Sequence, residues 1–162
     1  MSTFVAQQVT RSHTIHLPCT VERAFPLFEP LGEKLWAHDW EPMILYPTSG
    51  AATVGAVFTT QHANEQTKIW TIIAYEKELA HIAYFNVLPH CYTSRIDIRC
   101  EAAGTQATRA YITYTLTALT PHGNAHIERF TNEQQYRAYI SSWEKAIGHY
   151  LLYGRMLPQE ED

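Results

Sequence analysis

The chain has 162 residues, of which 46% are hydrophobic and 12% aromatic, and its formal net charge is −4. This length suits one domain whose core needs no disulfide or metal, and the composition excludes a disordered chain. The negative charge and the lack of a basic cluster argue against binding to nucleic acid.

The composition also bears on location and assembly. No apolar run approaches the roughly 20 residues needed to span a bilayer, so no integral membrane association is expected. Residues 1–17 lack a continuous apolar segment with a cleavage site, which predicts a cytoplasmic protein. Three widely spaced cysteines are predicted to be free thiols, namely Cys19, Cys91 and Cys100. We predict one domain over residues 1–158 with an acidic tail at 159–162, and a monomer or homodimer.

The first part of the chain predicts one strand and two short helices. Residues 9–17 alternate loosely between apolar and polar, as a strand does. Thr20 is placed to cap a helix, which Pro26 should kink or shorten because proline lacks a backbone donor. A second short helix is predicted over residues 33–37.

The middle of the chain predicts a meander of antiparallel strands joined by short turns. In the last two of these strands apolar and polar residues alternate, so one wet face and one dry face are expected. Between residues 69 and 75 both alternating sets are apolar, which leaves the facing of that strand open. The predicted strands cover residues 43–46, 54–62, 68–75, 81–88, 93–101 and 108–119.

The strongest pattern is a long amphipathic helix from Thr131 to about Arg155, where apolar residues recur at three-and-four spacing. Thr131 and Gln134 form a capping-box pattern, and Gly154 marks the end. At about 1.5 Å per residue the helix would run roughly 35 Å, so it needs a wide apolar surface to lie on. We therefore predict an α+β fold, in which a curved antiparallel sheet of six or seven strands wraps around this helix.

This order of elements resembles the START-like (SRPBCC) superfamily, which has the Bet v 1-like helix-grip fold. The superfamily includes lipid carriers, plant hormone and allergen-type binders, polyketide cyclases and the Hsp90 co-chaperone activator domain. Fold alone therefore does not decide the function. The residues that carry the resemblance are HLPCTVERAF at 16–25, WAHDW at 36–40 in the second helix, GAVF at 55–58, YEKEL at 75–79 leading to Tyr84, the strand 108–119, and Trp143 in the closing helix.

The resemblance implies a cavity between the concave face of the sheet and the long helix, open near the short helices. Physical reasoning agrees, because a curved sheet cannot touch a straight helix along its full length. The remaining volume must hold large side chains or a ligand. We expect the ligand-binding residues to be Trp36, His38, Trp40, Phe58, Tyr84, Asn86, Ile98, Tyr114, Tyr139, Trp143 and Ile147.

Three hypotheses about function follow. The first is a binder of a small apolar or aromatic molecule, with little or no catalysis. The second is an enzyme similar to polyketide cyclases or dehydratases, with His38 or a tyrosine hydroxyl as proton donor. A buried ionisable group with a shifted pKa would favour it. The third is an interaction module similar to the Hsp90 activator domain, which would use an exposed apolar patch.

No metal ion or cofactor is expected. His13 and His16 lie three apart on a strand, so they face opposite sides of the sheet. His122 and His126 have a helical ligand spacing, but the Gly-Asn pair between them indicates a loop or a helix start. The motifs of nucleophilic hydrolases, dinucleotide and phosphate sites and zinc proteases are not found in the sequence.

Overall fold

The computed structural model describes residues 3–62 and 64–159, so residues 160–162 of the predicted acidic tail lie outside the described part. Among the described residues, no helix combines the length and apolarity needed to cross a membrane. The elements in chain order are β1 (Gln8–Leu17), α1 (Val21–Ala24), η1 (Phe25–Phe28), η2 (Glu33–Leu35), β2 (Met43–Tyr46), β3 (Val57–Thr60), β4 (Lys68–Glu76), η3 (Lys77–Leu79), β5 (His81–Leu88), β6 (Tyr92–Gly104), β7 (Ala107–Ala118), α2 (Pro121–Phe130) and α3 (Glu133–Tyr153), where η denotes a short 3-10 helix.

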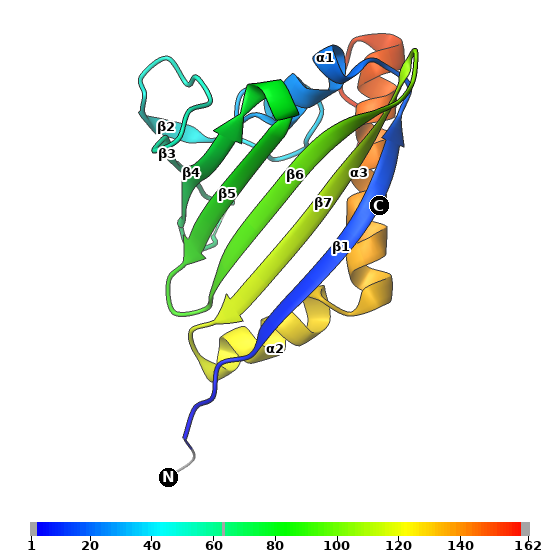
Figure 1. Cartoon of the computed structure of the whole chain (residues 1–162). Coiled ribbons are helices and arrows are strands. Elements are labelled where there is room, and N and C mark those ends of the chain that lie inside the picture. The colour runs from blue at the N-terminus through cyan, green and yellow to red at the C-terminus, as the bar shows by residue number, and fades with distance from the viewer. Residues whose placement is uncertain (1–2, 63, 160–162) are drawn as a thin grey trace.

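The strands form one antiparallel sheet of seven strands, in the order β1-β7-β6-β5-β4-β3-β2. Strands β2 to β7 follow one another as a meander, and β1 joins the sheet beside β7 (Figure 1). The predicted antiparallel sheet, the short helices after the first strand and the long C-terminal helix are therefore all confirmed.

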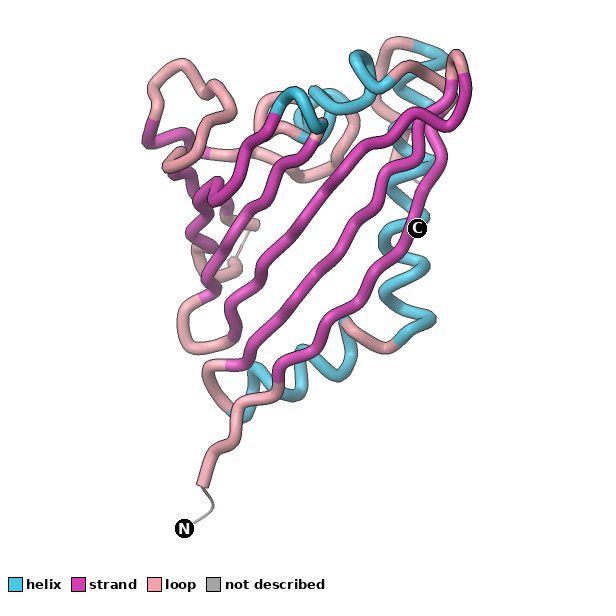
Figure 2. The backbone as a smooth tube through the Cα atoms, viewed as in Figure 1, coloured by secondary structure: helices cyan, strands magenta, loops and turns pink. Residues whose placement is uncertain are grey.

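The helices cover the sheet and its two ends. Helix α3 runs beside β1, with α2 at one end of the sheet (Figure 1). The short helical turns gather at the other end (Figure 2). Tyr136, Ile140 and Ile147 of α3 are fully buried, and the Tyr136 hydroxyl donates to the backbone oxygen of Ile112 on β7 at 2.8 Å. The buried side chains hold α3 against the sheet, and the hydrogen bond fixes its position along β7.

Alternation along the strands divides them into a buried and a wet face. On β7 every second residue from Thr108 to Ala118 is buried, as predicted. The facing of β4, which the sequence left open, is settled by its pairing with β5: Trp70 and Ile72 point inward, while Ile69 and Ile73 are exposed. A register shift between Ile72 and Ala74 then changes the alternation, as a β-bulge does. The three cysteines are free and buried, as predicted.

The predicted start of the long helix is wrong. Asn132, not Thr131, caps α3, because its side chain accepts hydrogen bonds from the backbone of Gln134 and Gln135. Thr131 instead ends α2, and its hydroxyl donates to the Ile127 oxygen at 2.6 Å. The region around His122 and His126, predicted as a loop or helix start, is the ten-residue helix α2.

The short helices are also shorter than predicted. Thr20 precedes α1, but its side chain makes no capping bond, and at Pro26 the α-helix has given way to the 3-10 turn η1. The second helix, predicted over residues 33–37, is only the turn η2. Residues 36–40 are not helical, and Asp39 has a positive φ of 59°. All five residues of this non-helical segment line the cavity described next.

Candidate functional site

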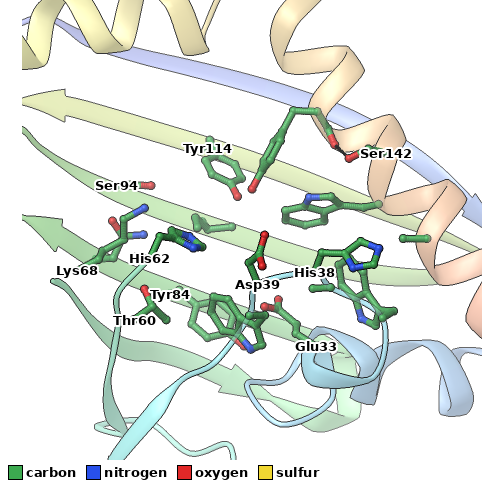
Figure 3. Close-up of a pocket in the computed structure, with 18 of the residues that line it drawn as sticks. Glu33, His38, Asp39, Thr60, His62, Lys68, Tyr84, Ser94, Tyr114 and Ser142 are labelled. Carbon is green, nitrogen blue, oxygen red and sulfur yellow. Dashed lines mark hydrogen bonds between the residues drawn. The ribbon is translucent and has the colours of Figure 1, made fainter. Parts of the chain in front are cut away.

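A cavity of about 770 Å³ lies between the sheet, α3 and residues 33–40 (Figure 3). Its floor comes from inward-facing residues of β4 to β7, which on β6 and β7 alternate with less buried residues of the outer face. Its other walls are Tyr139, Trp143 and Ala146 of α3, and His126 and Phe130 of α2. The curvature of the sheet therefore leaves a space that the side chains line with aromatic rings.

The predicted ligand-binding residues come together around this cavity, with two exceptions. Phe58 is on β3 and is covered on the cavity side by Trp70, whose ring stacks on it at 5.5 Å. Ile147 is fully buried in the core, because it lies about 100° around the helix from Ala146. The predicted residues that do line the cavity are Trp36, His38, Trp40, Tyr84, Asn86, Ile98, Tyr114, Tyr139 and Trp143.

The aromatic wall at residues 36–40 is anchored by its polar atoms. The indole nitrogen of Trp36 donates to the Leu27 oxygen at 2.7 Å, and that of Trp40 to the Pro30 oxygen at 2.8 Å. Each indole thus keeps its apolar ring for the cavity while its N–H is satisfied by the backbone. The Tyr84 hydroxyl is held in the same way, because it donates a hydrogen bond to the Phe28 oxygen at 2.6 Å, so its hydrogen is not available to a ligand.

The carboxyl group of Glu33 is buried in this aromatic wall. The chain before it passes so close to Pro26 that a Cβ on Gly32 would lie 1.8 Å from the Pro26 oxygen, so this position requires glycine. Figure 3 shows the Glu33 and Asp39 carboxyl groups pointing into the cavity, which Tyr114 faces from the sheet. Burial raises the pKa of Glu33 well above its ordinary value. Such a carboxyl group holds its proton at a higher pH and can donate a hydrogen bond.

Comparison with known proteins establishes the fold. No protein-family model and no curated protein matches the chain. Among solved structures, norcoclaurine synthase from Thalictrum flavum in complex with dopamine and hydroxybenzaldehyde has a TM-score of 0.64 at 12% identity, over 91% of this chain and 88% of that chain. Ara h 8.0201 has a TM-score of 0.63 at 15% identity, over 90% of this chain and 99% of that chain.

An uncharacterised protein from Rhizobium leguminosarum has a TM-score of 0.65 at 14% identity, over 90% of this chain and 97% of that chain. These likenesses extend over nearly the whole chain. The chain has a Bet v 1-like helix-grip fold. The helix that this fold grips is α3, and the cavity lies where α3 and the sheet separate.

His38, predicted as a proton donor with a tyrosine hydroxyl as the alternative, lines the cavity of this helix-grip fold. Its Nε2 atom is buried and has no hydrogen-bond partner within residues 3–62 and 64–159. Its neighbour Asp39 occupies the left-handed region of backbone space, which turns the chain sharply between the two indoles. The two side chains therefore take different directions into the cavity, and Figure 3 shows them apart.

Several residues that line the cavity were not predicted from the sequence. Trp70, Tyr92 and Ser94 occupy inward positions of their strands, where period-two alternation could have placed them. Ser94 carried the clearer signal, because a polar residue at an inward position needs a partner. Lys68 and Glu33 carried no such signal, since one begins a strand and the other belongs to a three-residue turn.

Proposed function

We propose that the protein binds a small aromatic or apolar molecule in the cavity under α3. The observation that carries this proposal is the cavity itself, whose volume of about 770 Å³ falls within the range of roughly 300–1,000 Å³ typical of small-molecule sites. Its walls combine aromatic rings with a few polar groups, which is the usual composition of a ligand site.

The similar structures support the same proposal. Norcoclaurine synthase, which has this fold, was solved with dopamine and hydroxybenzaldehyde, two small aromatic molecules. In the present chain the rings of Trp36, Tyr114 and Trp143 form one connected aromatic surface, with centroids 5.8 Å apart between the two indoles and 6.3 Å between Tyr114 and Trp143. A flat apolar ligand can pack edge-on or offset against such rings.

A neutral fluorescent probe, N-phenyl-1-naphthylamine, is expected to bind the native protein at about one molecule per chain. Tyr114→Ala should enlarge the cavity and change the relative affinity for this probe and the smaller naphthalene by roughly 1 to 3 kcal/mol. Fluorescence titration with both molecules measures the change.

The control is Tyr111→Ala, three residues away on the outward face of β7, where the hydroxyl donates to Glu101 at 2.7 Å. This variant should leave both affinities unchanged. The proposal is overturned if the wild-type protein binds neither probe. It is also overturned if Tyr114→Ala and Tyr111→Ala both unfold cooperatively and change the ratio of the affinities for the two probes by the same factor.

Glu33 supports a second proposal, an enzyme that uses acid–base chemistry on a carbonyl compound. The raised pKa keeps a proton on this group nearer to neutral pH, where a general acid must hold one. Among the described residues the cavity also holds the Tyr114 hydroxyl, whose pKa is raised by burial. The proton donor in this proposal is therefore Glu33 and not His38.

Benzoylacetone, an aromatic diketone, tests this second proposal. If Glu33 donates its proton to a carbonyl oxygen while solvent water takes up a proton from the central carbon, the enol forms and deuterium exchange at that carbon is accelerated. Glu33→Gln is expected to lower the catalysed exchange rate by about 100-fold or more, while His38→Ala has little effect. Proton NMR in deuterium oxide follows the exchange. If wild-type protein binds the diketone without accelerating the exchange, the enzyme proposal is wrong and the binding proposal stands.

A further inference from the structure

The end of the cavity formed by β4, β5 and β6 contains two buried polar atoms without partners. Asn86 and Ser94 face each other directly across the β5–β6 pair, and both residues are 2% exposed. Asn86 Oδ1 and Ser94 Oγ have no hydrogen-bond partner within the part of the chain that the structure describes. Leaving a buried polar atom unpaired costs about 1 to 3 kcal/mol, so such atoms usually meet a partner. Both side chains line the cavity, so the Ser94 hydroxyl can donate to a bound molecule, while Asn86 Oδ1, which only accepts, needs a donor from a side chain or a ligand.

Lys68 brings a positive charge to the same place. Its ammonium lies 5.6 Å from the ring centre of Trp70 on β4 and 5.3 Å from that of Tyr92 on β6. Since β5 lies between these two strands, the ammonium is positioned over β5, the strand that carries Asn86. Lys68 makes no ion pair with any described residue. Burial lowers its pKa, although Glu65 opposes this shift, so an anion placed beside the ammonium would offset its desolvation.

Charged side chains line the cavity from several elements. The carboxyl groups of Glu33 and Asp39 come from residues 33–40, Lys145 belongs to α3, and Lys68 lies on β4 (Figure 3). On the Lys68 side, helix α2 contributes His126, which stacks on Tyr92 at 4.7 Å. Burial lowers the pKa of His126, and the positive charges of Arg129 and Lys68 lower it further. Glu65 acts on Lys68 from nearby, but it forms no ion pair with the ammonium among the described residues, so a ligand anion is favoured beside Lys68.

Resting on the binding function proposed above, we infer that the ligand carries a carboxylate and that this group binds at the Lys68 end of the cavity. The Lys68 ammonium has three donors, enough to contact the carboxylate and Asn86 Oδ1 together. The Ser94 hydroxyl donates a further hydrogen bond to the carboxylate. The apolar part of the ligand then lies along the aromatic wall toward Trp36 and Trp143. The ligand class is thus a small amphipathic carboxylic acid.

Two probes of equal size test this inference: 2-naphthoate, which is anionic at pH 7.5, and the neutral 2-naphthamide. Wild-type protein should bind the naphthoate at least 10-fold more tightly in fluorescence or calorimetric titration. Lys68→Met keeps most of the length of the side chain and removes its charge, so it should bring the ratio of the two affinities close to one while naphthamide binding persists. Ser94→Ala should reduce the ratio several-fold.

The matched control is Lys77→Met on the exposed turn η3, which should leave the ratio unchanged. If Lys68→Met and Ser94→Ala fold and keep the wild-type ratio, or if wild-type protein binds the amide as well as the acid, the head-group inference is wrong and the binding function stands. If wild-type protein binds neither 2-naphthoate nor 2-naphthamide but binds N-phenyl-1-naphthylamine, the inference is again wrong. If none of the three molecules binds, the proposed function fails together with it.

Discussion

Ending the chain after Phe130, which removes α3, is expected to abolish cooperative unfolding. Three large side chains of α3 are at most 2% exposed, namely Tyr136, Ile140 and Ile147. Losing a buried side chain of this kind costs about 2 to 5 kcal/mol, and the whole domain is expected to be stable by only about 5 to 15 kcal/mol. Three such losses together are comparable to the whole stability available, and the loss of the partly buried Trp143, Tyr150 and Leu151 adds to them. Urea unfolding followed by circular dichroism should show a broad drift in place of a sigmoidal transition.

The matched control ends the chain after Gly154, the αL residue that terminates α3. This shorter deletion keeps the whole packing face of the helix, so a sigmoidal transition with nearly the wild-type slope is expected. A sigmoidal transition of that slope in the chain ending at Phe130 would show that the sheet forms a stable core without α3.

The sheet and α3 could be predicted because their signals are local and repeated. Strand β7 alternates over its full length, and α3 keeps its apolar spacing over several turns, so single exceptions do not hide the pattern. The capping residue was misplaced by one position, because both Thr131 and Asn132 are good caps and only the geometry of the α2–α3 junction decides between them.

Helix α2 could not be predicted because its unusual residues serve distant contacts. Gly123 permits a close approach, since a Cβ at this position would lie 1.8 Å from the backbone oxygen of Cys91. The Asn124 side chain accepts from the backbone of Gln7 at 2.8 Å and donates to the Val5 oxygen at 2.9 Å. In the sequence alone, glycine followed by asparagine indicates a turn. The role of Gly123 depends on Cys91, and that of Asn124 on Val5 and Gln7, all of which are distant from α2 in the sequence.

The candidate site divides in the same way. The aromatic lining follows from alternation and helical period, which is why Tyr84, Tyr114 and Trp143 were expected at the cavity. Phe58 does not line the cavity, because Trp70 on the neighbouring strand stacks on it. Lys68 and Glu33 are charged residues that the sequence places at ordinary solvent-exposed positions, and only tertiary packing turns both toward the cavity.

Glu33→Gln is expected to stabilise the protein increasingly as the pH rises. In the unfolded chain Glu33 ionises at an ordinary pKa of about 4.3. In the folded chain burial raises the pKa well above that value. The stability that goes with the protonated form is therefore fully present below the unfolded pKa, and it is lost as the pH rises through the folded pKa. Glutamine has a similar shape and cannot ionise, so the variant escapes this loss.

The difference in unfolding free energy between variant and wild type should be small near pH 4 and should favour the variant by pH 8. It grows by about 1.4 kcal/mol for each unit of separation between the two pKa values. Urea unfolding of both proteins across this range measures it, and all other groups cancel in the difference. Glu78→Gln, on the exposed turn η3, gives the baseline for an ordinary glutamate. A difference for Glu33→Gln that stays flat over the range would mean that the carboxyl group is ionised and solvated in the folded protein, and would remove the basis for assigning it a proton-donating role.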